Sequence, residues 1–125
     1  MVEKVLLKPN QRKDERNMIT ISEIIGRRQI VAYNNQNIPI YQFRRWSMEG
    51  LELQKVIVFQ KGIELETTDC FANKEESEIT VTFDETKFDL SKYVYFKAYF
   101  WCEQYQRFYD VEFYQKIKKD DGKCY

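Results

Sequence analysis

The chain has 125 residues, of which 43 % are hydrophobic and 16 % are aromatic, and this size is typical of a single domain with its own core. Its 20 basic and 20 acidic side chains cancel, which argues against a protein that binds a phosphate backbone through a basic excess. Three widely spaced cysteines and the lack of any histidine argue against a disulfide framework, a zinc site and histidine-based catalysis.

The first 17 residues are predicted to form a polar N-terminal arm. A short apolar segment at 5–7 is followed by a charged run, in which Pro9 interrupts any helix. Neither the apolar segment of a signal peptide nor a run long enough to span a bilayer is recognisable. We therefore expect an arm over residues 1–17 that contacts other subunits, followed by one β domain over residues 18–125.

The segment 18–25 fits two descriptions. Thr20 and Glu23 have the spacing of a capping box, and Gly26 offers a helix stop, so one helical turn is a fair prediction. The isoleucine-rich alternation of the same segment predicts a strand. Both descriptions stay open.

The next elements are predicted to be strands joined by short turns. We expect strands over 29–33 and 38–46, a turn at 34–37 between them, and a loop at 47–50.

A hairpin is predicted over residues 51–67, because Gly62 can adopt the positive φ that a tight turn needs. A three-residue loop would pair Phe59 with Ile63, whereas a two-residue loop would pair Val58 with Leu65. Both registers stay open.

An acidic, irregular loop is predicted over 68–77, and its carboxylates lack the spacing of a calcium-binding loop. Residues 78–83 alternate apolar and polar side chains, which predicts a half-buried strand. Residues 84–90 are expected to connect this strand to the next, with room for one turn of helix.

The last two predicted strands, over 93–102 and 107–117, turn around Gln104 and Tyr105. Centring the turn there places three pairs on a core face: Ala98 with Val111, Phe96 with Phe113, and Phe100 with Tyr109. The opposite face receives an opposite-charge pair and two aromatic pairs: Lys97 with Glu112, Tyr95 with Tyr114, and Trp101 with Phe108. Such cross-strand pairs stabilise sheets.

Short strands, few helix signals and a turn every ten or so residues predict an all-β fold. We expect a single antiparallel β-sandwich or a partly open barrel, preceded by the polar arm.

The outward face of the last strand pair is the candidate interface with a protein, because exposed contiguous aromatic surface marks interaction sites. Its members are Tyr93, Tyr95, Lys97, Tyr99, Trp101, Phe108, Glu112 and Tyr114. The alternative is that a second sheet, the arm or a loop of the same chain covers this face.

A second candidate contact combines basic and aromatic side chains at Arg44, Arg45 and Trp46. Such a patch could stack bases and hold phosphates. The nearby Glu49 and Glu52 and the neutral net charge argue against a nucleic-acid partner, so we expect Trp46 in the core or an interface.

From Gln29 onward the strand pattern resembles the immunoglobulin-like β-sandwich domains of phage tail and baseplate proteins, particularly the N-terminal domain of upper-baseplate proteins. The resemblance rests on the rhythm of five stretches, 29–33, 34–39, 79–83, 92–100 and 108–117. The loop at 47–50 and the charged arm depart from that family, and no functional residue carries over. The resemblance implies a sandwich fold and a role in virion assembly.

We therefore expect a non-catalytic assembly module without a cofactor or a membrane partner, and foremost a structural component of a phage tail, baseplate or capsid. Its partners would be copies of itself or other virion subunits, and its location the virion or the host cytoplasm. The alternative is a small inhibitor, of the anti-defence or immunity type, that binds and blocks one host protein.

Overall fold

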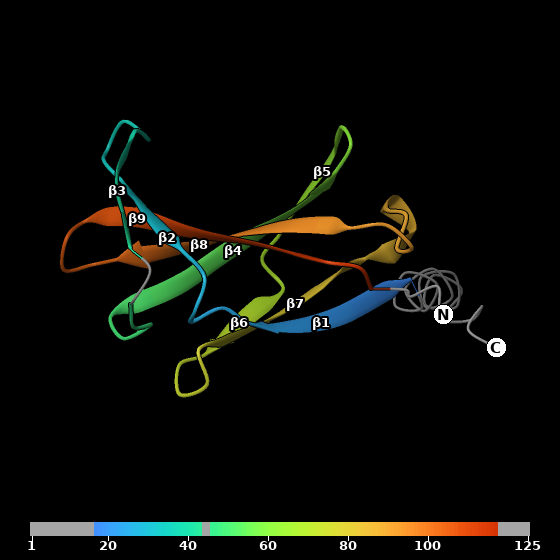
Figure 1. Ribbon diagram of the computed structural model, residues 1–125, viewed down its shortest axis with the longest axis horizontal. Helices are drawn as coiled ribbons and strands as arrows, with labels where there is room; N and C mark the ends of the chain where they lie inside the picture. Colours follow the sequence, from blue (N-terminus) through green and yellow to red (C-terminus); the bar gives the residue numbers. More distant parts are fainter. Residues whose placement is uncertain (1–16, 44–45, 118–125) are drawn as a thin grey trace, which may run out of the picture.

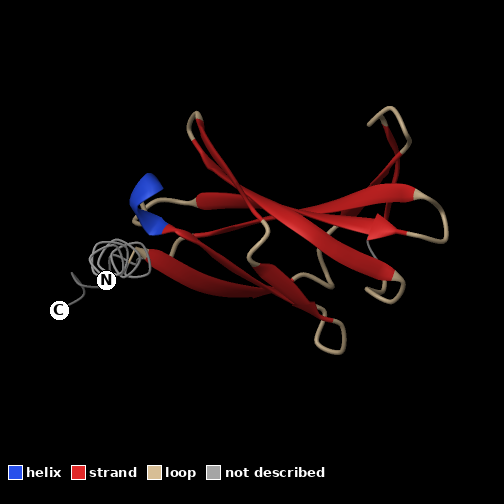
Figure 2. Cartoon of the chain, turned by 180° about the vertical axis from the view of Figure 1, so that it is seen from behind, coloured by secondary structure: helices blue, strands red, loops and turns tan. Residues whose placement is uncertain are grey.

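The computed structural model describes residues 17–43 and 46–117. In those residues the chain forms nine strands and one 3-10 turn. The strands are β1 (Met18–Ile24), β2 (Ile30–Tyr33), β3 (Pro39–Phe43), β4 (Leu51–Gln60), β5 (Ile63–Thr67), β6 (Cys70–Asn73), β7 (Glu78–Asp84), β8 (Val94–Cys102) and β9 (Arg107–Gln115). The turn, η1 (Glu85–Lys87), lies between β7 and β8 at one end of the molecule (Figure 2).

The strands form two antiparallel sheets that face each other. One sheet has the order β1-β7-β6 and the other β3-β2-β9-β8-β4-β5. Neither sheet closes into a barrel, and the hairpins β2–β3 and β4–β5 rise on the side away from the three-stranded sheet (Figure 1). The predicted all-β class is confirmed, and its architecture is a β-sandwich.

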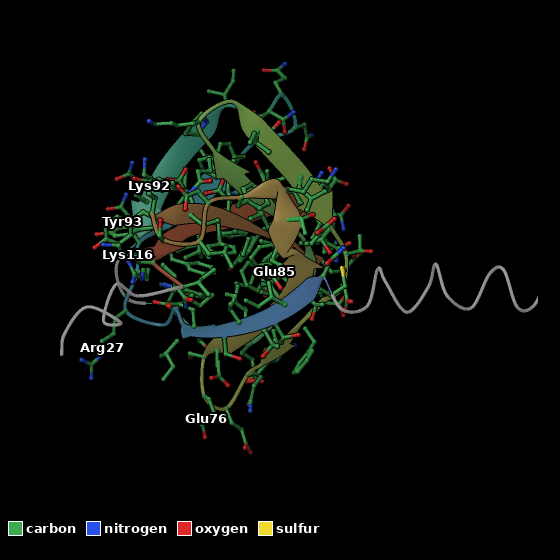
Figure 3. All side chains as sticks on the ribbon, turned by 90° about the vertical axis from the view of Figure 1, so that its right-hand side faces the viewer. Arg27, Glu76, Glu85, Lys92, Tyr93 and Lys116 are labelled. Atoms are coloured by element: carbon green, nitrogen blue, oxygen red, sulfur yellow. The ribbon has the colours of Figure 1, made fainter. Side chains whose placement is uncertain are left out.

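The core fills the space between the two sheets (Figure 3). Phe83 on β7 and Phe96 on β8 are both fully buried, and their rings meet edge to face with centroids 5.6 Å apart. Phe96 also stacks on Phe113 of β9 at 4.8 Å. Burial of such rings supplies most of the free energy that holds two sheets together.

The segment 18–25 is a strand rather than a helical turn. β1 pairs with β7 from Met18 opposite Asp84 to Ile24 opposite Glu78. Its alternation buries Ile21 and leaves Thr20 and Ser22 on the outer surface. A partner strand some sixty residues away therefore decides between the two local descriptions, as tertiary context commonly does.

The hairpin β4–β5 has the two-residue loop, because Val58 pairs with Leu65 and Gln60 with Ile63. Lys61 and Gly62 both have positive φ, 38° and 81°. Two successive positive φ values are typical of the type I′ turn, whose twist matches that of the flanking strands.

The prediction of an irregular loop over 68–77 is wrong for its first half. Residues Cys70–Asn73 form β6, which pairs with β7 across the turn that follows. The Asn73 side chain accepts hydrogen bonds from the backbone N–H groups of Glu75 and Glu76, which stabilises this turn. Glu75 and Glu76 thus occupy the turn, while Cys70 and Ala72 pack against the core.

The strand predicted over 38–46 is shorter than expected, since β3 ends at Phe43 and Trp46 lies outside it. By contrast, the register predicted for the last strand pair is confirmed at every pair, from Phe96 opposite Phe113 to Trp101 opposite Phe108. The described residues include no helix with the length and apolar character of a membrane span.

Candidate protein-binding face

The eight residues predicted as an interface share the outer side of the six-stranded sheet, and we call them the aromatic face: Tyr93, Tyr95, Lys97, Tyr99, Trp101, Phe108, Glu112 and Tyr114. Seven of them lie on β8 or β9, where alternation turns their neighbours into the core and these side chains outward, and Tyr93 directly precedes β8. Four of the rings keep 40–50 % of their surface exposed, namely Tyr93, Tyr95, Phe108 and Tyr114.

One end of the aromatic face is a cluster of four rings. Tyr114 lies 5.2 Å from Tyr93 and 5.7 Å from Tyr95, measured between ring centroids, and Phe59 of β4 stacks on Tyr95 at 5.7 Å. Figure 3 shows Tyr93 beside Lys116, whose ammonium lies 5.8 Å from the Tyr93 ring centroid. The sequence reasoning missed Phe59, because only the β4–β8 pairing places it opposite Tyr95.

The middle of the face carries charges that are already paired. Lys97 and Glu112 form an ion pair at 3.3 Å across the β8–β9 ladder. Lys55 of β4 lies 5.4 Å from the Tyr99 ring centroid and 3.3 Å from a carboxylate oxygen of Glu66. Charges of both signs therefore alternate with the rings.

These charges affect the pKa of Lys97. Burial by itself would lower the pKa of this ammonium, but the surrounding Tyr99, Asp110 and Glu112 raise it above its usual value. Lys97 is therefore charged throughout the physiological range, and the ion pair persists there.

The other end of the face is held by Trp101 and Phe108, whose rings meet edge to face at 4.8 Å. The indole Nε1 of Trp101 donates a hydrogen bond of 2.9 Å to Glu103 in the β8–β9 turn. This contact orients the indole, which lies half-buried on the outer side of the sheet.

Asp110 also lies on this side of the sheet, but it is buried, with only 3 % of its surface exposed. Tyr33 on β2 donates a hydrogen bond to its carboxylate, whereas the second oxygen, Oδ2, has no hydrogen-bond partner among the described residues. Burial raises the pKa of Asp110 above its usual value, and Glu112 acts in the same direction. The alternation of side chains along β9 indicates on which side of the sheet Asp110 lies, but it does not indicate that this side chain is buried there.

Two hollows open on the outer side of this sheet and share Tyr33. The first, of about 660 Å³, is lined by Ile24, Arg27, Arg28, Gln29, Val31, Tyr33, Asp110 and Glu112. The second, of about 500 Å³, is lined by Tyr33, Asn37, Lys55, Tyr99 and Phe108. The aromatic face is therefore continuous with hollowed surface rather than being a flat sheet.

The second predicted contact divides between two parts of the chain. Arg44 and Arg45 lie outside the described residues. Trp46 packs against the core, with its ring 6.2 Å from that of Phe100, and its Nε1 donates a hydrogen bond of 2.7 Å to the carbonyl oxygen of Arg28. Trp46 thereby attaches its loop to the core.

The outer side of the three-stranded sheet differs from the aromatic face. Its centre consists of hydroxyl groups, which pair as Thr20 with Thr82 at 2.8 Å and as Ser22 with Thr80 at 3.0 Å. Its exposed ring is Phe71 on the edge strand β6, which is 63 % exposed. The two outer surfaces of the sandwich are thus chemically distinct.

The three-stranded sheet packs on the inward side of β8 and β9, so it does not cover the aromatic face. Among the described residues, the loop between β1 and β2 comes closest to doing so, since the Arg28 guanidinium lies 5.8 Å from the Tyr114 ring centroid. Tyr114 nevertheless remains half exposed.

Comparisons of the chain with protein-family models, with curated proteins and with solved structures found no match. The resemblance to phage tail and baseplate domains therefore stays a prediction. Among residues 17–43 and 46–117, no three His, Cys, Asp or Glu side chains gather as a metal site.

Proposed function

We propose that this chain is a non-catalytic protein-binding module and that the aromatic face is its contact surface. The observation that carries the proposal is the continuous set of half-exposed rings on one side of the sandwich, opposite a side lined by hydroxyl groups. Large exposed rings are costly to leave in water and gain most when a partner covers them, as at interface hot spots.

The charges of the aromatic face favour a protein partner over a nucleic acid. Lys97 is paired with Glu112, and Lys55 with Glu66, so neither is free to hold a phosphate without losing its carboxylate. A surface that alternates rings with ion pairs of both signs is typical of protein interfaces, where polar groups surround aromatic anchors.

Within this class we propose an assembly role, in which the partner is another subunit of a phage virion or a second copy of the chain. The resemblance of the strand rhythm to phage tail and baseplate domains supports a virion subunit as the partner. An antiparallel sandwich that exposes aromatic rings on one outer surface is compatible with either partner. The alternative partner is a host protein that the chain blocks.

The experiment compares the wild type with a Tyr95→Ala, Tyr114→Ala double variant and with Phe71→Ala, a matched control that removes an exposed ring from the opposite sheet. Light scattering after size-exclusion chromatography measures self-association. Affinity capture with quantitative mass spectrometry measures partner recovery from infected and uninfected host cells.

We expect the double variant to lose self-association or partner recovery, and Phe71→Ala to retain it. Recovery of virion proteins supports assembly, whereas one stoichiometric host enzyme supports the inhibitor. Equal behaviour of the double variant and the wild type in both measurements would show that the aromatic face is not a binding surface.

A further inference from the structure

The outward pairs of the β8–β9 ladder are complementary to themselves when their two members exchange places. Two of them join a ring to a ring and a third, between these two along the strands, joins a cation to a carboxylate: Tyr95 with Tyr114, Trp101 with Phe108, and Lys97 with Glu112. The fourth outward pair joins the Tyr99 phenol to the buried carboxyl group of Asp110.

This exchange is the one that a two-fold axis produces. An axis parallel to the strands and midway between β8 and β9 would lay β8 of one copy of the chain on β9 of a second copy, and the reverse. Tyr95 of each copy would then lie over Tyr114 of the other, and at the opposite end of the face Trp101 would lie over Phe108. Rings therefore meet rings in both rows, and such contacts gain most when water is removed from them.

The charged row between the rings is also complementary to its own copy. Lys97 and Glu112 are paired at 3.3 Å, and their side chains are 28 % and 61 % exposed, so a second copy can reach both. Under the same axis Lys97 of each copy faces Glu112 of the other, and four charges alternate in sign. Lys55 and Glu66 beside them form another pair, so the ion pairs in the middle of the face have no net charge that would repel an identical face.

The shape of the six-stranded sheet permits this packing. Hairpin β2–β3 rises at the end of the face where Tyr33 lies opposite Phe108, and hairpin β4–β5 rises at the other end, where Phe59 lies opposite Tyr95 (Figure 1). The two hairpins form opposite edges of the sheet. The axis leaves each hairpin at its own end but places it over the opposite edge of the second sheet, where that sheet is not raised, so twisted sheets pack face to face in this way without collision.

We propose that the chain forms a two-fold symmetric homodimer through the aromatic face, with β8 of one copy packed on β9 of the other. The inference rests on the proposed function and names a second copy as the partner. An unrelated partner would have to be complementary to the face, but it would place no requirement on how the face fits a copy of itself. Self-complementarity in every exposed row is the property that a symmetric dimer does require.

The test measures the mass of the full chain by light scattering after size-exclusion chromatography and by native mass spectrometry, at protein concentrations up to about 0.5 mM, which covers weak dimers. The samples are the wild type, Lys97→Glu, Glu112→Lys and an equimolar mixture of these two variants. The matched control is Glu76→Lys, which makes the same change of charge in the turn of the other sheet (Figure 3).

We expect the wild type and Glu76→Lys to be dimers. Lys97→Glu and Glu112→Lys should each weaken dimerisation by about tenfold or more, because two identical faces then carry the same net charge. Their mixture should recover a dimer that contains one copy of each variant, because the two faces now carry opposite charges. This recovery also shows that both variants are folded.

A wild type that stays monomeric over the whole range of concentration would overturn the proposal. So would a dimer that survives in either single variant, or a mixture that does not recover, because the face would then contact a different surface of the second copy. These results are separable from the proposed function, since a monomeric chain that captures another protein through Tyr95 and Tyr114 would remove only the homodimer. The proposed function itself fails if the Tyr95→Ala, Tyr114→Ala variant associates and captures partners as the wild type does.

Discussion

Tyr33 and Asp110 lie diagonally across the β2–β9 ladder, and the phenol of Tyr33 donates a hydrogen bond to the Asp110 carboxylate. Burial, followed by this hydrogen bond, raises the pKa of the Tyr33 phenol well above its usual value. Tyr33 therefore keeps its proton, and remains a hydrogen-bond donor, beyond the pH at which a phenol normally ionises, so that near neutral pH the group of this pair that can titrate is Asp110.

Asp110 should make stability fall as the pH rises. Burial raises its pKa, and Glu112 adds to this, whereas the hydrogen bond from Tyr33 and the charge of Lys97 act in the opposite direction. The folded chain therefore holds this proton to a higher pH than the unfolded chain does. Between the two pKa values the unfolded chain has lost the proton and the folded chain has not, so the free energy of unfolding decreases as the pH rises.

Asp110→Asn removes this dependence. From about pH 3 to about pH 7 we expect the free energy of unfolding of Asp110→Asn to rise relative to that of the wild type, because only the wild type loses stability as the pH increases. Urea unfolding at a series of pH values measures this difference. A constant difference would mean that Asp110 titrates alike in the folded and unfolded chains.

The contact between Phe83 and Phe96 should contribute much of the free energy with which the two sheets pack together. Phe83→Ala removes a fully buried ring at the centre of the core, so we expect a loss of about 3–5 kcal/mol in the free energy of unfolding. Phe71→Ala on the outer surface should change stability by about 0.5 kcal/mol at most. Similar losses in the two variants by urea unfolding would contradict this core.

The ion pair between Lys97 and Glu112 should couple the two middle strands weakly. A double-mutant cycle with Lys97→Ala and Glu112→Ala should give a coupling free energy of about 0.2–1 kcal/mol, because Glu112 is largely exposed to water. The coupling should decrease with added salt. A coupling that is zero at low salt would show that the pair does not form in solution.

A side chain at the second position of the turn formed by Lys61 and Gly62 should lower the stability of the fold. Gly62→Ala places a Cβ at a positive φ of 81°, so we expect a loss of about 1 kcal/mol. Lys61→Asn should be neutral or stabilising, because asparagine tolerates this conformation and favours type I′ turns. Thermal unfolding compares the two, and equal stability of Gly62→Ala and the wild type would exclude the positive φ.

The amino-acid sequence by itself determined the register of β8 and β9, because the turn and the alternation of side chains act within one hairpin. Every pair on both faces follows from centring the turn at Gln104 and Tyr105. The same local signals placed the rings of the aromatic face on one side of the sheet.

Only the tertiary structure decided the features that depend on distant partners. The segment of β1 is a strand because it pairs with one edge of β7. β6 forms where the sequence predicted a loop, because it pairs with the other edge of β7. Phe59 joined the aromatic face through the β4–β8 pairing. Alternation along β9 says on which side Asp110 lies, but its burial depends on β2 and the loop before it, which are some eighty residues away in the chain.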